Sequence, residues 1–520
     1  MENAFQILPI GKMVNYANRV LKGTIYIFLI SLLAALLGYF VRIVLAKGLT
    51  KEEYGLFYAV FSLVALVGIF KNLGLSQALA KFIPEYLSKK DFSGIKSSIV
   101  LTFLVQFGIT TVISIILFLL SDSLSMFLFH TETASSVLKL LILMFWLMPL
   151  ENVFRFSFQG FQKMLLYASV ELIRMLFVLI LILIFIWKGF GVMAPSLSYV
   201  FVYLIVPVVC FPFFLRIFPR FFKEKLNINK ELLRKLLKFG IPVMAGIFGA
   251  IIMLYTDTVI LSYFGTLEDV ALYQAASPTA RILLYLGYAL AAVFLPLSAE
   301  LWAKGKKEKL RQGIQILYKF SFILVIPMAL AMLVFPDLIL KLLFGKEYIG
   351  AAIVLQILSI GTVFYTVGHI NSNILSGIGH PAENTRIVLS AALFNLVLNL
   401  ILIPFYGILG AALATLISWA IILVFTSLKI KKYVGAHAPW WGWAKNLTAG
   451  VVFVVVISVI KRLLEMSVLA EVIISLGLAS LAYAGLLLAL GLVTKNDLSF
   501  VSYATGIQKL SKKQILRMFK

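Results

Sequence analysis

Apolar runs of about twenty residues recur along this chain, and they restrict its fold more than any other feature. An α-helix of about 20 apolar residues crosses a hydrocarbon layer of about 30 Å. Hydrophobic residues make up 62% of the 520 residues and charged residues only 13%, so the apolar surface is too large for a water-soluble core. The sequence therefore predicts an all-α polytopic membrane protein.

The runs predict about 14 transmembrane helices. The first is too long for a signal peptide and lacks a small-residue cleavage site, so we expect it to stay in place as a signal-anchor. An even number of helices places both termini on one side of the membrane. The predicted spans are 24–46, 57–80, 99–120, 137–160, 165–186, 192–217, 238–264, 273–301, 314–335, 350–377, 384–404, 407–429, 446–463 and 468–493.

The net charge of +24 follows the membrane topology rather than nucleic-acid binding, and no nucleic acid is expected as a partner. Most basic residues lie in loops on the side of the termini, whereas the connections 121–136 and 265–272 carry none. Basic loops stay in the cytoplasm. We therefore expect a multi-pass protein of the cytoplasmic membrane with cytoplasmic N- and C-termini.

A basic linker, 218–237, separates two halves of similar length. Its leucines recur at helical spacing from Lys230 to Lys238, which predicts an interfacial helix on anionic membrane lipids. The halves show a weak repeat at an offset of about 216 to 218 residues, best seen where 51–57 overlays 267–273. We predict two six-helix lobes, 1–217 and 238–430, related by a pseudo-two-fold axis along the membrane normal, then two extra C-terminal helices within 431–494 and a basic cytoplasmic tail, 495–520.

Charged side chains inside the spans are costly and are functional candidates. Glu151 with Arg155 and Glu171 with Arg174 have the spacing of ion pairs within one helix. These pairs suit either a structural role or contact with a substrate, and the two glutamates are candidates for gating or coupling.

Arg42, Lys71, Arg281 and Asp257 have no opposite charge three or four residues away. The repeat offset carries position 42 onto position 258, so Arg42 and Asp257 occupy nearly equivalent places in the two halves. One hypothesis is that they form an ion pair that closes an external gate. The alternative is that each is neutralised within its own half.

The excess of basic residues within the spans predicts a cavity for a negatively charged headgroup. Arginine binds phosphate through paired hydrogen bonds. The candidate headgroup residues are Arg42, Lys71, Arg155, Arg174 and Arg281. Polar side chains in the tenth and eleventh spans could contact sugar or form interhelical hydrogen bonds; they are His369, Asn371, Asn373, Asn395 and Asn399.

No enzyme signature is found. The sequence contains neither a phosphate-binding Walker loop nor a nucleophile elbow. Its histidines lack metal-ligand spacing, and Cys210 is its single cysteine. We expect no catalysis, no metal and no cofactor.

Segments 42–57, 74–86, 158–162, 256–258 with Tyr273, and 402–412 together resemble the polysaccharide flippases of the multidrug/oligosaccharidyl-lipid/polysaccharide exporter superfamily. The resemblance implies two six-helix lobes around a central cavity that opens alternately to either side. It implies a polyprenyl-pyrophosphate-linked oligosaccharide as cargo, a lipid-tail groove formed by the extra helices, and cavity-lining roles for Arg42 and Arg281. Glycan polymerase or ligase proteins would be further partners.

Two alternatives remain at this stage. One is a cation-coupled multidrug exporter of the same superfamily, although its cationic substrates require acidic residues in the cavity. The other is a membrane scaffold of envelope assembly that transports nothing. Glycosyltransferase genes beside this gene would favour the flippase.

Overall fold

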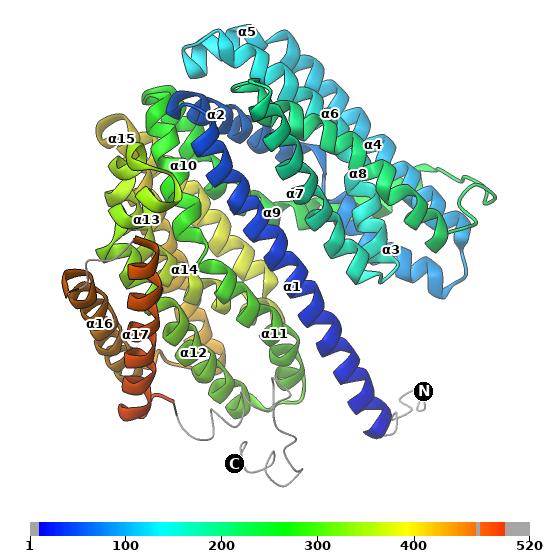
Figure 1. Ribbon diagram of the computed structural model, residues 1–520. Coiled ribbons are helices and arrows are strands. Elements are labelled where there is room, and N and C mark those ends of the chain that lie inside the picture. Colours follow the sequence, from blue (N-terminus) through cyan, green and yellow to red (C-terminus); the bar gives the residue numbers. More distant parts are fainter. Residues whose placement is uncertain (1–9, 464–467, 494–520) are drawn as a thin grey trace. The chain divides into compact units, whose positions relative to one another are not determined.

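The computed structural model describes residues 10–463 and 468–493, and every regular element in these ranges is helical (Figure 1). Eleven of the described helices are long and apolar enough to cross a membrane. An all-helical membrane protein is thereby confirmed. The predicted tail, 495–520, lies outside the described residues.

The helices are α1 (Ile10–Gly48), α2 (Lys51–Val67), η1 (Gly68–Lys71), α3 (Leu75–Ser88), α4 (Phe92–Leu119), α5 (Ser121–Leu124), η2 (Ser125–Phe129), α6 (Thr133–Gly160), α7 (Met164–Trp187), α8 (Met193–Ile217), α9 (Lys230–Phe264), α10 (Leu267–Arg281), α11 (Leu284–Ala303), α12 (Lys307–Val334), α13 (Pro336–Leu343), η3 (Lys346–Ala351), α14 (Ala352–Gly377), α15 (Pro381–Val434), α16 (Trp440–Leu463) and α17 (Val468–Ala489). Each predicted span overlaps at least one of them. Two predicted spans fall within α15, which bends at Gly407, where φ is 52°.

The prediction of one unbroken helix over 57–80 is wrong. α2 begins at Lys51, and the segment from Gly68 to Gly74 interrupts the span before α3. Leu73 and Gly74 have positive φ values of 44° and 71°, which stop an α-helix. A Cβ atom on Gly74 would lie 1.9 Å from the carbonyl oxygen of Gly240, so α9 approaches the break too closely for any other residue.

The predicted interfacial helix over Lys230–Lys238 is the first part of α9 rather than a separate element. The Asn229 side chain caps α9 by accepting a hydrogen bond of 2.8 Å from the Leu232 backbone N–H. Leu232 and Leu236 are buried in a hydrophobic cluster with residues of α3. This part of α9 therefore packs against protein with its leucines.

Two helices begin with the same reciprocal cap at positions 216 residues apart. The Glu53 backbone N–H donates to the Thr50 hydroxyl, and the Thr50 N–H donates to the Glu53 carboxylate. Thr266 and Asp269 exchange the equivalent pair of hydrogen bonds at the start of α10. Such a capping box satisfies N–H groups that a helix start leaves without partners.

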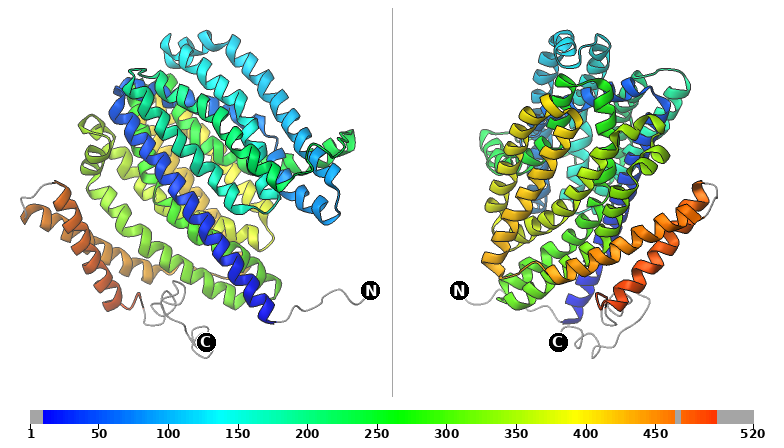
Figure 2. Two further views of the ribbon diagram at one scale, coloured as in Figure 1. Left: turned by 45° about the vertical axis from the view of Figure 1, so that its right-hand side comes forward. Right: turned by 90° about the vertical axis from the view of Figure 1, so that its left-hand side faces the viewer.

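The chain's contacts group it into two compact units. The first contains 10–279, 337–354 and 385–418; within it α1 packs along α7, and α6 packs against α4 and α8 (Figures 1 and 2). The second contains 280–336, 355–384, 419–463 and 468–493; within it α16 and α17 pack against each other.

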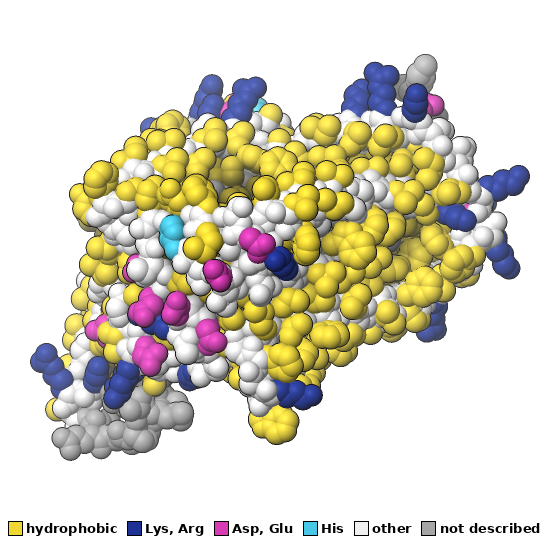
Figure 3. Space-filling view, turned by 90° about the horizontal axis from the view of Figure 1, so that it is seen from above, with side chains coloured by type: hydrophobic (Ala, Val, Ile, Leu, Met, Phe, Trp, Pro, Cys, Tyr) yellow, Lys and Arg dark blue, Asp and Glu magenta, His cyan; other side chains and the backbone are white. Residues whose placement is uncertain are grey.

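Acidic side chains gather on the face seen from above in Figure 3. The connection between α4 and α6 and the starts of α2 and α10 lie toward this end in Figure 1. These segments carry Glu52, Glu53, Asp122, Glu132, Glu268 and Asp269, all at least partly exposed. The segments come from the connections predicted to be external.

Candidate functional site

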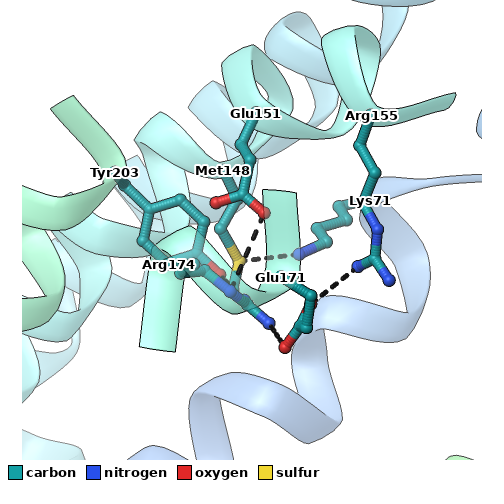
Figure 4. Close-up of polar contacts among 7 residues, drawn as sticks. All are labelled: Lys71, Met148, Glu151, Arg155, Glu171, Arg174 and Tyr203. Atoms are coloured by element: carbon teal, nitrogen blue, oxygen red, sulfur yellow. Dashed lines mark hydrogen bonds and ion pairs between the residues drawn. The ribbon is translucent and has the colours of Figure 1, made fainter. Parts of the chain in front are cut away.

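Five of the charged residues predicted to be functional meet in one cluster of the first unit (Figure 4). α6 provides Glu151 and Arg155, and α7 provides Glu171 and Arg174. Lys71 comes from the break between α2 and α3. α6 packs against both α3 and α7, and this packing brings residues from three stretches of sequence together.

The ion pairs of this charged cluster run mainly between helices. Glu171 accepts from Arg155 at 2.9 Å and also pairs with Arg174. Arg174 lies 3.8 Å from a carboxylate oxygen of Glu151 and donates to the Tyr203 hydroxyl. The pairing of Glu171 with Arg174 on α7 forms as the spacing suggested. Glu151, however, pairs with Arg174 rather than with Arg155 on its own helix.

Lys71 has a different environment. Its ammonium lies 2.7 Å from the Met148 sulfur and 5.6 Å from the centre of the Phe145 ring. Within the described residues, no carboxylate lies within 4.0 Å of it. A sulfur atom is a weak acceptor, so the Lys71 charge is poorly neutralised by direct contacts.

The charged cluster carries one excess positive charge, because Lys71, Arg155 and Arg174 face two glutamates. Buried polar atoms also lack hydrogen-bond partners within the described part of the chain: Glu151 Oε2, Arg155 Nε and Arg174 Nε. Buried polar atoms normally have partners. The cluster is therefore suited to receive an anion, a proton or water.

Arg42 belongs to a second polar network in the same unit. Its guanidinium donates to the Gln274 side chain at 3.0 Å and lies 4.3 Å from the centre of the Tyr58 ring. Gln274 in turn donates to the Thr258 hydroxyl at 2.7 Å. The neighbouring Asp257 accepts from the Thr258 backbone N–H and from the Tyr273 hydroxyl. Arg42 and Asp257 are thus connected through Gln274 and Thr258.

This network follows the internal repeat. With the offset of 216, Arg42 is equivalent to Thr258, and Tyr58 is equivalent to Gln274. Arg42 contacts Tyr58 within the first half, and Thr258 contacts Gln274 within the second. Tyr58 and Gln274 were not among the residues predicted from the sequence, although shifting Tyr58 by the offset would have identified Gln274.

The candidate residues of the second unit occupy α10 and α14. The Arg281 guanidinium lies 5.7 Å from the centre of the Trp419 ring. The His369 ring lies between those of Tyr288 and Tyr365, with centroid distances of 4.6 and 5.8 Å. Asn373 donates to the His369 carbonyl at 2.9 Å.

Of the other asparagines, Asn371 bonds to neighbouring helices, whereas Asn395 and Asn399 bond to each other within α15. Asn371 accepts from Tyr318 and donates to Ser427 at 3.0 Å, so it links α12, α14 and α15. Asn399 donates to Asn395 at 3.2 Å, and both lie in the first-unit part of α15. Interhelical hydrogen bonding accounts for Asn371. Asn395 and Asn399 retain buried atoms without partners in the described residues.

Sequence comparisons relate the chain to membrane proteins of glycan synthesis. A family model described as polysaccharide biosynthesis protein matches residues 20–302, and a second, described as MatE, matches 242–401. An uncharacterized membrane protein of Methanocaldococcus jannaschii is 32% identical over 513 residues, covering 96% of this chain and all of that protein. A probable low-salt glycan biosynthesis flippase of Haloferax volcanii is 29% identical over 204 residues, covering 38% of this chain and 43% of that protein.

Solved transporter structures share the fold. A lipid II flippase in an inward closed conformation aligns with a TM-score of 0.72 at 17% identity, covering 93% of this chain and all of that one. A multidrug resistance transporter in an inward-facing conformation aligns with a TM-score of 0.65 at 16% identity, covering 79% and 98%.

Proposed function

We propose, from the premise that this chain belongs to the polysaccharide biosynthesis protein family, that it is a flippase for a lipid-linked glycan. Its cargo is an oligosaccharide joined to a polyprenyl carrier through phosphate or pyrophosphate. The protein moves this cargo across the cytoplasmic membrane by alternating access through a cationic central cavity. It catalyses no covalent step.

The observation that carries this proposal is the excess positive charge of the partly buried cluster at Lys71, Arg155 and Arg174. A buried positive charge without a matching carboxylate is expensive in a membrane protein. A phosphate that entered the cluster would neutralise the charge, and the arginines would bind it through paired hydrogen bonds. Arg42 and Arg281 provide further positive charge along the path of the headgroup.

The carboxylates of the cluster provide a means of coupling. Glu171 is held by Arg155 and Arg174, and Glu151 by Arg174. An anion that binds Arg174 competes with both carboxylates. A carboxylate released in this way takes up a proton or a cation, so entry of the headgroup and uptake of a positive charge occur together.

The repeat supports two lobes, residues 1–217 and 238–430, within a 14-helix protein. A Cβ atom on Gly55 would lie 3.2 Å from the backbone nitrogen of Ala271, and positions 55 and 271 are equivalent under the offset of 216. Equivalent positions that touch lie close to a two-fold axis. Near this axis Arg42 and Asp257 form the external gate, which breaks and reforms as the lobes move.

The remaining features concern the membrane. The basic loops place both termini in the cytoplasm and attract anionic lipids to the linker, 218–237, and the tail, 495–520. Glycan polymerase or ligase proteins receive the cargo on the external side.

Transport in vesicles of defined composition tests this function. Wild-type protein moves fluorescent polyprenyl-pyrophosphate oligosaccharide between leaflets, measured as protection of the fluorophore from an external quencher. Lys71→Gln leaves two arginines facing two glutamates, so the ion pairs persist without the excess charge. We expect this variant to lose most of the transport while keeping its melting temperature.

Lys139→Gln, which breaks an exposed pair with Asp122, is the matched control. Transport by Lys71→Gln at the wild-type rate would contradict the role of the cluster.

A multidrug exporter is the second candidate, because the MatE model matches residues 242–401. Glu151 and Glu171 would then bind a coupling cation or proton. The same vesicles, given ethidium and a sodium or proton gradient, separate the two functions. Export of ethidium without movement of the lipid-linked glycan would replace the flippase, and movement of neither compound would favour a scaffold.

A further inference from the structure

Five aromatic rings and an arginine form a continuous cluster in the second unit, here called the aromatic ledge. Tyr285 and Tyr288 of α11 are in edge contact with a centroid distance of 6.0 Å. Tyr288 contacts His369 of α14, and Tyr365 contacts both His369 and Trp419, the latter at 5.2 Å. Arg281 lies beside Trp419. The charged cluster and the Arg42 network lie in the first unit and do not include these aromatic rings.

The ledge has a buried base and an exposed rim. Trp419 is only 3% exposed, whereas Tyr285 and Tyr288 are 38% and 37% exposed. Tyr365 and His369 have intermediate exposure. The buried Trp419 thus anchors a row of rings, and Tyr285 and Tyr288 at the other end of the row remain accessible.

The position of the ledge argues against an interfacial belt of aromatic residues. α11 continues for fifteen residues from Tyr288 to Ala303, about 22 Å at 1.5 Å per residue. α14 begins seventeen residues before His369 at Ala352, about 25 Å away. Interfacial belts lie at the ends of spans that cross about 30 Å of hydrocarbon. Tyr285 and Tyr288 lie in the first turns of α11, but α10 ends only two residues before α11 begins, so both tyrosines lie near the middle of the stretch Leu267–Ala303.

The composition of the ledge argues against contact with lipid tails. His369, Asn373 and Arg281 carry strongly polar groups, and such groups within spans face the protein interior or a water-filled path. The Tyr288 ring, which is 37% exposed, is in edge contact with the His369 ring. Polar groups of this kind favour a ledge that borders a polar path over one that faces hydrocarbon.

We propose that the aromatic ledge is a glycan-binding subsite for the pyranose rings of the cargo. The axial C–H groups of a pyranose form an apolar, slightly positive face that stacks on the negative face of an aromatic ring. The tyrosine hydroxyls, His369 and Asn373 provide hydrogen bonds that orient the sugar hydroxyls. This inference rests on the proposed function, since it assigns the sugar part of the same cargo to the second unit.

Transport of two carriers tests the subsite in vesicles. The first carrier is polyprenyl pyrophosphate without sugar, and the second bears five N-acetylglucosamine residues. We expect Tyr288→Ala and Tyr285→Ala to slow the glycan-bearing carrier about tenfold without slowing the bare one. Tyr288→Phe keeps the stacking ring and most of the rate. Tyr406→Ala removes a tyrosine that is 59% exposed outside the ledge and is the matched control.

A binding measurement separates failure of the subsite from failure of the function. Saturation-transfer NMR with free chitopentaose and the full chain in nanodiscs should transfer magnetisation to sugar C–H protons in the wild type and not in Tyr288→Ala. Equal slowing of both carriers by Tyr288→Ala, or slowing of neither, overturns the subsite. A wild type that moves neither carrier overturns the proposed function, and the NMR result alone then decides whether the ledge binds glycan.

Discussion

Arg42 of α1 donates a hydrogen bond of 3.0 Å to Gln274 of α10, 232 residues further along the chain. Gln274 also donates to Thr258, the repeat equivalent of Arg42. One amide side chain thus serves an arginine in the first half and a threonine in the second. This sharing links α1, α9 and α10 through one side chain.

Removing the Gln274 amide should weaken both of these contacts. Gln274→Leu leaves the Arg42 guanidinium with its Tyr58 contact and the Thr258 hydroxyl without its donor, so we expect a loss of about 1–3 kcal/mol in the free energy of unfolding. Thermal unfolding in detergent measures it. Thr366→Val, which removes a hydroxyl that donates to the Thr362 carbonyl of its own helix, is the control, and equal effects of the two changes would count against a shared bridge.

The proposed gate predicts energetic coupling between Arg42 and Asp257. A double-mutant cycle on the rate of transport, with Arg42→Gln and Asp257→Asn, should give a coupling energy of about 0.5–3 kcal/mol. Coupling is expected because both side chains belong to one hydrogen-bonded network. Additive effects of the two substitutions would remove the gate pair.

The charged cluster predicts that one substitution compensates for another. Glu171→Gln raises the excess charge from one to two and leaves Arg155 and Arg174 to repel each other, so stability and transport should fall. Adding Lys71→Gln returns the excess to one. We expect the double variant to melt at a higher temperature than Glu171→Gln alone. Glu268→Gln, which breaks an exposed pair with Lys51, should change stability by less than about 1 kcal/mol.

If the double variant melts no higher than Glu171→Gln, net charge does not govern the cluster. The specific hydrogen bonds from Arg155 and Arg174 to Glu171 would then be the property that matters.

Gly55 lies where two backbones meet. A Cβ atom there would lie 1.8 Å from the carbonyl oxygen of Leu267, a distance that side-chain rotation cannot relieve. Gly55→Ala should therefore separate α2 from α10 and lower the yield of folded protein in detergent. At Gly108 a Cβ atom meets nothing within 4 Å, so Gly108→Ala should be neutral or stabilise its helix by about 0.5–1 kcal/mol. Normal folding of Gly55→Ala would show that these backbones can move apart freely.

The salt bridge between α3 and α9 predicts a pH dependence. Hydrogen bonds from Lys235 and then Lys89 hold the pKa of Glu85 below its ordinary value. A carboxylate with a lowered pKa stabilises the fold above its unfolded pKa and loses this contribution as the pH falls through the folded value. The melting temperature should fall less between pH 6 and about pH 3 in Glu85→Gln than in the wild type. An identical pH profile would show that the bridge contributes no stability.

Much of the helical framework could be predicted because lipid requires each span to satisfy its own backbone hydrogen bonds. The sequence also predicts a weak repeat at an offset of about 216 to 218 residues, and the paired caps at Thr50 and Thr266 lie 216 residues apart. The break at Leu73 and Gly74 was not visible. It depends on the close approach of Gly240, which is remote in sequence.

The spacing of charged residues along one helix likewise did not predict which of them form ion pairs. Glu151 has Arg155 one turn away, yet it pairs with Arg174 of another helix. Tyr203 and Tyr288 gave no signal, since tyrosines are common in membrane spans.

The sequence by itself determined the membrane class, the approximate helix positions and the excess of positive charge, because these follow from composition and from periodicity along the chain. Only the tertiary structure decided that Lys71, Glu171 and Arg174 share one cluster and that Arg42 reaches Gln274. The physical reason is that ion pairs and hydrogen bonds act over about 3 Å, whereas their partners are joined only when distant helices pack.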